Sequence, residues 1–354
     1  MKAVRVLRHG GVEVLTYGSI PKPKIQPDEI LVEVKACALN HLDLWVRQGL
    51  PGIRVPMPIV PGSDVAGVVA EVGERAAGVK KGDPVILAPG VSCGQCRACL
   101  AGEDNLCPDY SVLGLHRDGG CAEYIKITAP NVVPMPESLS FVEAASVPMT
   151  FLSAWHMLVT RAKVAPGETV LVLAAGSGVG SAAVQVAKLF GARVIATAGT
   201  AEKLIKAADL GADETINHSK KDILGEVMHF TERRGVDVLI EHVGSATWEK
   251  SLRCLARNGR LVTCGATTGP LVKLDLRYLF SRQLSLLGSY MGSKAELLQV
   301  IQHFGQKKLR PVVDHVLQFK EIQTAHRLLE ERKQFGKIVL TPEVPARKKT
   351  RTKH

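Results

Sequence analysis

The 354-residue chain lacks any apolar run long enough to cross a bilayer, so we expect no membrane-spanning helix. Its first residues, MKAVRVLRHGGVEVLTYG, lack the apolar segment of a signal peptide and are typical of a strand. No internal repeat is present. With 46% hydrophobic and 22% charged residues, the composition predicts a soluble globular protein of about two domains. Eight cysteines without an export signal favour a cytoplasmic location.

Acidic residues are also absent from the last eight positions, RKKTRTKH, which hold five of the 45 lysines and arginines. Without these five the net charge falls from +11 to +6, a modest excess for a chain of this size. We therefore interpret residues 342–354 as a basic disordered tail. RNA binding through this tail is a less favoured alternative, and a phosphate-rich cofactor would also account for part of the positive charge.

Four of the cysteines lie within fifteen residues: Cys93, Cys96, Cys99 and Cys107. Thiolates this close can converge on one tetrahedral ion, and four soft ligands suit Zn²⁺. The last gap is too long for the ferredoxin pattern, and disulfides would need an oxidising compartment. We predict one structural zinc per chain. Such a site has no open position for a substrate, so the chemistry must lie elsewhere.

The sequence pattern changes near residue 150. Before it, short β-rich runs such as EILVEVKACALN and GSDVAGVVAEVG are broken by turn residues. After about residue 168, expected strands alternate with expected helices, and this pattern predicts a doubly wound parallel sheet. The strands are 169–175, 192–198, 236–244, 259–266 and 284–292, and the helices are 178–191, 201–212 and 248–258. A helix at 294–308 and a strand at 335–341 follow.

A loop of small residues joins the first of these strands to its helix, and it contains Gly176, Ser177, Gly178, Val179 and Gly180. Small residues allow backbone N–H groups to approach a pyrophosphate at the helix N-terminus. No Gly-Lys-Ser/Thr follows, which excludes a nucleoside-triphosphate loop. The position between a strand and a helix indicates dinucleotide binding; a tight turn without a ligand is the alternative.

The end of the second expected strand indicates which dinucleotide binds. NAD sites carry an acidic residue about twenty residues after the loop, where it binds the ribose 2′-hydroxyl. Here the strand ends Ala-Gly-Thr, and no acid occurs before Glu202. Thr200 and Lys203 could instead hold a 2′-phosphate, which favours NADPH. Lys203 as a merely solvated helix residue is the alternative.

The four-cysteine segment followed by this nucleotide fold resembles the medium-chain dehydrogenase/reductase superfamily, over residues 1 to about 340. The resemblance implies a GroES-like catalytic domain at 1–150 with a zinc lobe at 91–108. It also implies a Rossmann domain at 151–291, a return to the catalytic domain at 292–341, and a homodimer or homotetramer. The segments NHLDLWVRQG, PGSDVAGVV, SVPMTFLSAWH and AAGSGVGSAAVQ are similar to the zinc-free quinone oxidoreductase branch.

The same resemblance implies that the catalytic metal ligands are lost. The family's Cys-His-Thr-Asp run falls on residues 40–43, so Asn40 replaces the ligand cysteine. Its Gly-His-Glu run falls on residues 62–64, so Ser63 replaces the ligand histidine, and the third ligand falls near Met149. Asparagine and serine are poor zinc ligands, and a thioether suits Cu(I). We expect Asn40 and His41 to lie on one extended segment and to point in opposite directions.

Without a Lewis acid, hydride delivery to an electrophilic, conjugated acceptor is easier than oxidation of a simple alcohol. We therefore expect NADPH-dependent reduction of a quinone or α,β-unsaturated carbonyl, with Asn40 orienting the carbonyl. The alternatives are a zinc-dependent alcohol dehydrogenase and a non-catalytic NADPH- or RNA-binding protein. The predicted substrate-site residues are Asn40, Asp43, Trp45, Ser63 and Met149. The residues expected near the nicotinamide or elsewhere on the cofactor are Val243, Gly244, Gly265, Ala266, Tyr290 and Lys337.

Overall fold

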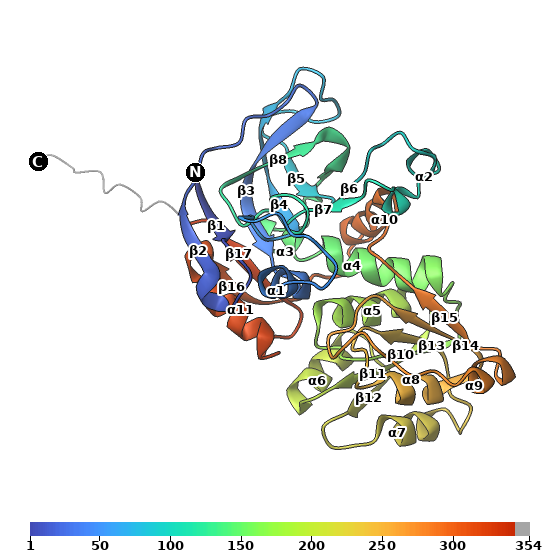
Figure 1. Ribbon diagram of the computed structural model, residues 1–354. Helices are drawn as coiled ribbons and strands as arrows, with labels where there is room; N and C mark the ends of the chain where they lie inside the picture. Colours follow the sequence, from blue (N-terminus) through green and yellow to red (C-terminus); the bar gives the residue numbers. More distant parts are fainter. Residues whose placement is uncertain (344–354) are drawn as a thin grey trace, which may run out of the picture.

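The computed structural model describes residues 1–343. The predicted basic cluster that begins at Arg347 lies outside the described residues. Two large β-sheets lie side by side, each with its own helices, and two further sheets have two strands each (Figure 1). The first sheet combines the N-terminal part of the chain with its C-terminal elements, and the second is formed by the middle of the chain. The predicted fold class, a β-rich domain combined with a doubly wound parallel sheet, is confirmed.

The first sheet has seven strands, largely antiparallel, and forms the core of the GroES-like domain. Along it lie β16 (Val313–Gln318), β17 (Lys337–Thr341), β3 (Glu29–Ala38), β4 (Asp64–Val72), β5 (Pro84–Leu87) and β9 (Val132–Pro134), with β8 (Tyr124–Thr128) paired to β3. Shorter strands are β1 (Lys2–Val6), β2 (Leu15–Ser19), β6 (Gly90–Val91) and β7 (Ser111–Val112). The helices are α1 (His41–Gln48), α2 (Arg97–Leu100), α3 (Phe141–Ala145) and α11 (Ile322–Glu330).

The second sheet has six parallel strands in the order β12-β11-β10-β13-β14-β15, the order of a Rossmann fold. The strands are β10 (Thr169–Val172), β11 (Arg193–Ala198), β12 (Glu214–Asn217), β13 (Val236–Glu241), β14 (Leu255–Thr263) and β15 (Ser285–Gly288). The helices are α4 (Pro148–Trp155), α5 (Gly178–Leu189), α6 (Ala201–Asp209), α7 (Ile223–Phe230), α8 (Trp248–Cys254), α9 (Leu276–Ser281) and α10 (Lys294–Gly305). All four residues of β10 are buried, as expected for a strand covered on both faces.

Two local expectations were wrong. The helix expected over 248–258 ends at Cys254, because Leu255 is buried and pairs with Val236 at the start of β14. His41 does not continue the extended segment of Asn40. Asn40 is the extended N-cap of α1, and His41 is the first residue of that helix.

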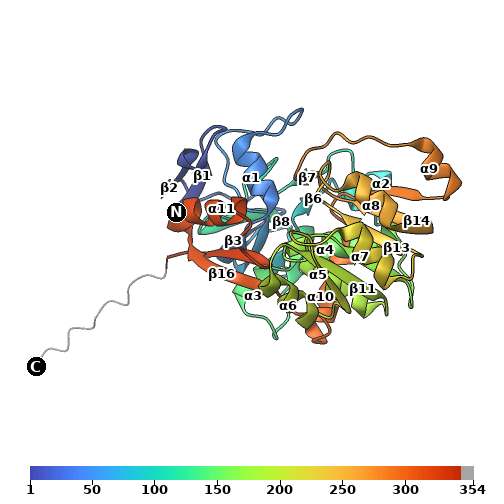
Figure 2. The ribbon, with the colours of Figure 1, turned by 90° about the horizontal axis from the view of Figure 1, so that it is seen from below.

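The two domains meet along α4 and α10, which run between the sheets (Figures 1 and 2). Leu297, Val300 and Phe304 of α10 are buried in the same core as the strands of the second sheet. The return to the catalytic domain was expected at residue 292, but its first strand is β16, which begins at Val313. Among residues 1–343, no helix has the length and apolar character needed to cross a membrane.

Candidate active site

The loop between β10 and α5 has the geometry of a phosphate-binding turn. Ser177 is the N-cap of α5, and its Oγ accepts a hydrogen bond from the Gly180 N–H at 2.9 Å. A Cβ on Gly180 would lie 2.4 Å from the Ala174 carbonyl oxygen, so this position requires glycine. The Gly336 N–H donates to the Gly176 carbonyl at 2.9 Å, which joins the start of β17 to the loop. The loop is thus held against the catalytic domain.

Lys203, in the first turn of α6, places its side chain beside the same loop. A Cβ on Gly176 would lie 3.0 Å from Lys203 Cδ, and Lys203 Nζ donates to the Arg332 carbonyl at 2.6 Å. Thr200 caps α6, with its Oγ1 accepting from the Lys203 N–H at 3.3 Å. Burial lowers the pKa of Lys203. No carboxylate stands between the end of β11 and Glu202, whose side chain pairs with Lys206 away from the strand end.

A cavity of about 210 Å³, here called the inner pocket, lies between the domains. Its walls come from the residues after β3, from α1, from α4, from the start of α5 and from the ends of β13, β14 and β15. The predicted site residues that line it are Asn40, Trp45, Met149, Ser177, Gly178, Val179, Gly265, Tyr290 and Lys337. Residues far apart in the sequence therefore converge on one space.

The polar end of the inner pocket is a closed network around Asp64, which has no exposed surface. Lys337 Nζ lies 2.8 Å from Asp64 Oδ2 and 2.6 Å from Asn40 Oδ1. Asn40 Nδ2 donates to Asp64 Oδ2 at 2.9 Å, and the Met149 N–H donates to Asp64 Oδ1 at 2.8 Å. The Asn40 amide is thus engaged on both sides and keeps one N–H for another acceptor.

Two predicted substrate-site residues lie behind this network and line neither cavity described here. Ser63 is fully buried, and its hydroxyl donates to the Leu113 carbonyl at 2.7 Å. Asp43 accepts from the N–H groups of Asn40 at 2.7 Å and Gly62 at 2.8 Å. Burial raises the Asp43 pKa to about 6, although these hydrogen bonds oppose the shift. Both side chains hold the backbone on which Asn40 and Asp64 are carried.

A larger cavity of about 710 Å³, the outer cleft, adjoins the inner pocket, and the two share Trp45, Cys264, Gly265 and Tyr290. Gly244 and Ala266, both predicted to flank the nicotinamide, line the outer cleft. Val243 lines neither cavity. Its carbonyl accepts from the Thr268 N–H at 2.7 Å and so fixes the loop beside the cleft.

Among the inner-pocket residues that the sequence reasoning missed are His242 and, as a wall residue, His41, whereas Cys264 belongs to a strand end that was expected beside the nicotinamide. Burial lowers the pKa of both histidines, so both are neutral at neutral pH. Burial raises the pKa of Cys264 to about 12, which keeps it a thiol. His242 and Cys264 directly follow β13 and β14. Strand ends of this sheet were expected to flank the cofactor, and this signal, which pointed to Cys264, could also have identified His242.

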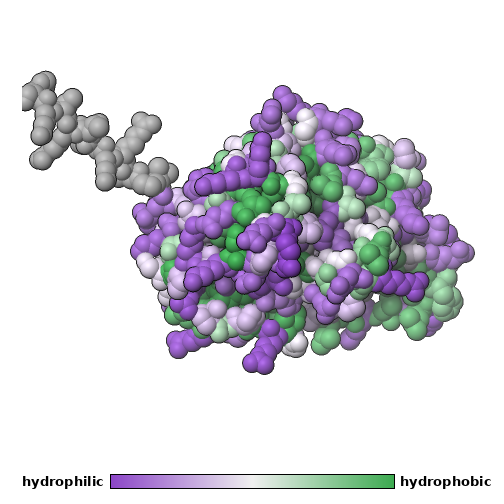
Figure 3. Space-filling model, turned by 90° about the horizontal axis from the view of Figure 1, so that it is seen from above, coloured by the Kyte–Doolittle hydropathy of each residue, from purple (hydrophilic) through white to green (hydrophobic). Residues whose placement is uncertain are grey.

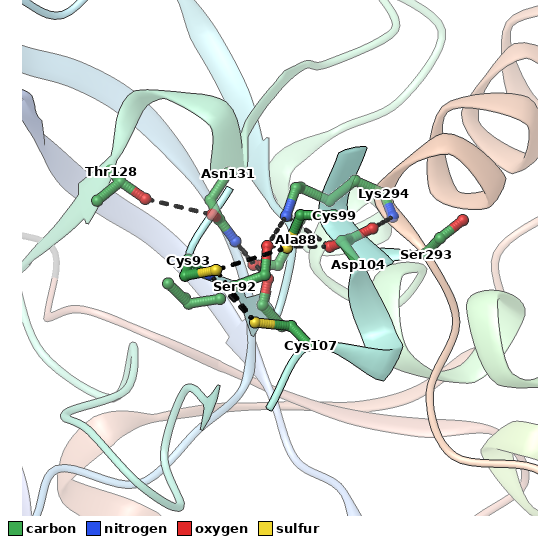
Figure 4. Close-up of polar contacts among 12 residues, drawn as sticks. Ala88, Ser92, Cys93, Cys99, Asp104, Cys107, Thr128, Asn131, Ser293 and Lys294 are labelled. Atoms are coloured by element: carbon green, nitrogen blue, oxygen red, sulfur yellow. Dashed lines mark hydrogen bonds and ion pairs between the residues drawn. The ribbon is translucent and has the colours of Figure 1, made fainter. Parts of the chain in front are cut away.

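The four cysteines predicted to hold zinc do lie together, with all four Sγ atoms within 4.8 Å of one another. Figure 4 shows three of them, Cys93, Cys99 and Cys107. The Sγ separations are 3.5 Å for Cys96–Cys99 and for Cys93–Cys107, and 3.9 Å for Cys93–Cys99. Tetrahedral Zn–S bonds of about 2.3 Å place the sulfurs roughly 3.8 Å apart. The residues present therefore fit a structural Zn²⁺, which would hold the lobe 91–108 in its fold.

The lobe is also tied to the nucleotide-binding domain. Lys294 at the start of α10 donates from its backbone N–H to Asp104 Oδ1 at 2.9 Å. Its Nζ lies 2.5 Å from Asp104 Oδ2 and 2.8 Å from Ser92 Oγ (Figure 4). Asn105 and Leu106 of the same lobe line the outer cleft. The lobe therefore connects the two domains beside the cleft.

Within residues 1–343, these cysteines are the only group of three or more Cys, His, Asp or Glu side chains whose ligand atoms cluster this closely. Around Asp64, by contrast, each carboxylate oxygen already accepts from a protein donor. The position where the resemblance implies a catalytic metal thus carries an ammonium, an amide and a carboxylate.

Comparisons with known proteins match this architecture. Residues 26–137 match a family model described as an alcohol dehydrogenase GroES-like domain, and residues 178–306 match one described as a zinc-binding dehydrogenase. An NAD-dependent alcohol dehydrogenase of Saccharolobus solfataricus is 32% identical, covering 97% of this chain and 100% of the relative. The quinone oxidoreductase of Homo sapiens is 30% identical, covering 96% and 97%.

Solved structures agree. A crystal structure of an NAD-dependent alcohol dehydrogenase is 48% identical and superimposes with a TM-score of 0.94, covering 97% of this chain and 100% of that chain. The crystal structure of AibC is 36% identical with a TM-score of 0.90, covering 97% and 96%.

Proposed function

Because the chain belongs to the zinc-binding alcohol dehydrogenase family of the medium-chain dehydrogenases/reductases, we propose that it transfers hydride from NADPH to a quinone or α,β-unsaturated carbonyl without a catalytic zinc. The observation that carries this proposal is the network of Asn40, Asp64 and Lys337 at the polar end of the inner pocket. Family membership makes the chain an oxidoreductase. The network supports a particular kind of acceptor.

The choice of acceptor rests on what the pocket offers to a reacting oxygen. A simple alcohol must lose its hydroxyl proton before it gives up hydride, and a metal makes that loss accessible near neutral pH. At its polar end the inner pocket has the Asn40 amide and the Lys337 ammonium. The oxygen atoms of Asp64 and of the Asn40 amide already accept hydrogen bonds from protein groups. A conjugated acceptor needs only hydrogen-bond donors, because its π system spreads the incoming charge. Bound NADPH would supply the hydride, and solvent would supply the proton.

The preference for NADPH is supported by the end of β11. An acidic residue that would bind a ribose 2′-hydroxyl is missing there, and Lys203 lies across the adjacent loop. Gly176 to Gly180 would hold the pyrophosphate at the start of α5. Thr200 and Lys203 would hold the 2′-phosphate. Two of the relatives described above are named as NAD-dependent enzymes. The preference for NADPH is therefore proposed from the residues of this chain and not from the names of its relatives.

We further propose a homodimer or homotetramer in the cytoplasm. The exposed apolar side chains Leu271, Leu276 and Phe280 are 88%, 63% and 69% exposed, around α9 and beside the open edge strand β15. Hydrophobic surface gathers at the lower right of Figure 3, the side on which α9 lies. Contiguous exposed apolar surface of this kind favours association. The substrate is a small molecule, and nothing in the described residues favours nucleic acid.

A screen of acceptors tests the proposal. Purified enzyme would be supplied with NADPH and, separately, a benzoquinone, an enone, an enal, an enoyl thioester, a saturated aldehyde and a saturated ketone. NADPH oxidation at 340 nm is expected with conjugated acceptors. Activity confined to saturated aldehydes and to the reverse oxidation of alcohols would refute the proposal.

The second candidate is a zinc-dependent alcohol dehydrogenase, favoured by the names of several relatives. Metal analysis separates the two. One zinc per chain agrees with a metal held by the four cysteines alone, whereas two zinc ions per chain would support the alcohol dehydrogenase.

A further inference from the structure

The ammonium of Lys337 belongs to the network that supports the proposed function, but that proposal gives it no role of its own. Lys337 is the first residue of β17, and it is 3% exposed. Its Nζ contacts Asn40 Oδ1 at 2.6 Å and Asp64 Oδ2 at 2.8 Å. An ammonium has three N–H donors, and these two contacts use two of them. Lys337 lines the inner pocket, and neither Asn40 nor Asp64 uses the third donor.

The direction of this side chain separates its charge from the phosphate loop. A Cβ on Gly178 would lie 3.0 Å from Lys337 Cδ and 3.7 Å from Cγ. The methylene groups of Lys337, not its charge, therefore cover the first turn of α5. The ammonium continues past the loop and ends between Asn40 and Asp64. A cofactor pyrophosphate on this turn would meet the stem of Lys337 and the backbone N–H groups of the loop.

The ammonium is also fixed in place. Asp64 has no exposed surface, and it is anchored on its other oxygen by the Met149 N–H at 2.8 Å. Asn40 is anchored by its own backbone N–H, which donates to Asp43 at 2.7 Å. Asp64 is thus held by a backbone N–H group, and the backbone of Asn40 is held by the Asp43 carboxyl. A charge fixed in this way can stabilise an anion without reorganising when the reaction occurs.

We propose that Lys337 Nζ, held by Asn40 and Asp64, forms an oxyanion site that binds the carbonyl oxygen of the conjugated acceptor and stabilises its enolate. This inference rests on the proposed function. Hydride adds to the β-carbon and forms a C–H bond there. The π electrons of the double bond move to give an enolate whose negative oxygen faces Lys337. Water then protonates the α-carbon, and the nicotinamide cofactor is oxidised. Lys337 keeps its proton throughout.

The site selects a class of substrate. The acceptor must carry an oxygen conjugated with the carbon that receives hydride, as enones, enals and quinones do. In a saturated carbonyl compound, the carbon that receives hydride is the carbonyl carbon itself, and the oxygen bonded to it becomes an alkoxide. Polarised alkenes without such an oxygen have no atom to place on Lys337. The inner pocket thus favours acceptors that become enolates or hydroquinone anions.

Binding of an anion analogue tests the site without turnover. The probe is 4-nitrophenolate at a pH where it is fully ionised, compared with neutral 4-nitroanisole of similar shape, both in the presence of saturating NADP⁺. Wild-type enzyme is expected to prefer the phenolate roughly 10- to 100-fold, the range for a hydrogen bond to a charged group. Lys337→Met should abolish this preference, and Lys337→Arg should restore part of it.

Lys203→Met is the matched control, because it removes another lysine that lies across the same loop. It should weaken NADPH binding and leave the phenolate preference intact at saturating NADP⁺. Thermal unfolding of each variant checks that it folds. A Lys337→Met enzyme that folds and still prefers the phenolate would overturn the oxyanion site.

Kinetics separate the site from the proposed function. If wild-type enzyme reduces enones, Lys337→Met should lower kcat more for a weakly activated enone than for a quinone, with little change in the Kd of NADPH. An equal loss for all acceptors, or a loss confined to NADPH binding, would show a structural or cofactor role and refute the site. Phenolate selectivity without any enone or quinone reduction would leave the anion site standing and refute the proposed reaction.

Discussion

Asp43 is the buried carboxyl whose protonation differs most clearly between the folded and unfolded protein. Burial raises its pKa from 3.8 to about 6, so the folded state holds a proton more tightly than the unfolded state. Between these two pKa values the native state binds more protons, and its free energy of unfolding falls as pH rises. The contribution is fully present below pH 4 and is lost above pH 6.

We subtract the free energy of unfolding of Asp43→Asn from that of wild type. This difference should decrease by roughly 2–3 kcal/mol from pH 4 to pH 6. The contributions of the carboxyl groups that both proteins share cancel in this difference. Urea denaturation at several pH values measures it. A difference that grows with pH would contradict the raised pKa.

Lys203 is the residue that should distinguish the two dinucleotides. Lys203→Ala removes a positive charge from the start of α6, where the 2′-phosphate is proposed to bind, so the Kd of NADPH should rise roughly 10-fold. The Kd of NADH, which lacks this phosphate, should change little. Fluorescence titration with both cofactors gives the two values. Equal weakening of both, or a strong preference of wild type for NADH, would refute this role.

At the scale of elements, the zinc lobe predicts a clear difference between cysteines. Cys96→Ser should reduce bound zinc well below one per chain, because a hydroxyl replaces one of four thiolates. Cys254→Ser makes the same chemical change in the core of the nucleotide-binding domain and should leave one zinc per chain. Elemental analysis of the purified variants measures this. Retention of zinc by Cys96→Ser would contradict the assignment.

The tie between the lobe and α10 predicts a second element-scale effect. Lys294 and Asp104 are 23% and 9% exposed, and Lys294→Met leaves the Asp104 carboxylate without its charged partner. We expect a loss of about 1–3 kcal/mol and faster hydrogen exchange in residues 92–107. Lys188→Met removes a more exposed partner of Asp213 and should cost less than about 1 kcal/mol. Equal losses of unfolding free energy for the two variants would show that the Lys294–Asp104 contact stabilises the protein no more than an exposed ion pair does.

The elements were predictable where side-chain pattern and position agree. The apolar runs of β10 and β13 and the small-residue loop before α5 each identify a part of a Rossmann fold. β16, with the sequence VDHVLQ, is a half-buried edge strand without clean alternation, so its pattern is weak. The start of α1 at His41 depends on the Asp43 side chain, which accepts from the Asn40 N–H. A capping contact of this kind is not visible in hydrophobic periodicity.

For the site, spacing predicted the cysteine lobe because its ligands are close in sequence. The Lys337–Asp64 contact joins residues 273 positions apart, and only the pairing of β17 with β3, and of β3 with β4, brings them together. The sequence predicted that Lys337 lies near the cofactor, but it did not predict the hydrogen bond from Lys337 to Asn40. Ser63 and Asp43 were expected at the substrate and instead support the backbone behind it.

For the whole molecule, the exposed apolar side chains near α9 predict association. Replacing both Leu276 and Phe280 by Glu should give a smaller species in sedimentation analysis, because the charges cannot be buried between subunits. Ile205 on α6, which is 70% exposed, provides a control: Ile205→Glu should leave the assembly unchanged. A wild-type monomer would refute the proposed oligomer.

The whole molecule also determines the reaction, because the inner pocket forms only where both domains meet. A conjugated acceptor and its saturated counterpart, 2-cyclohexen-1-one and cyclohexanone, differ by one double bond and fill nearly the same space. The decisive measurement is kcat/KM for both compounds with NADPH, using enzyme that carries one zinc per chain. The proposal predicts rapid reduction of the enone to the saturated ketone and little reduction of cyclohexanone. Comparable or faster reduction of cyclohexanone to its alcohol would contradict it.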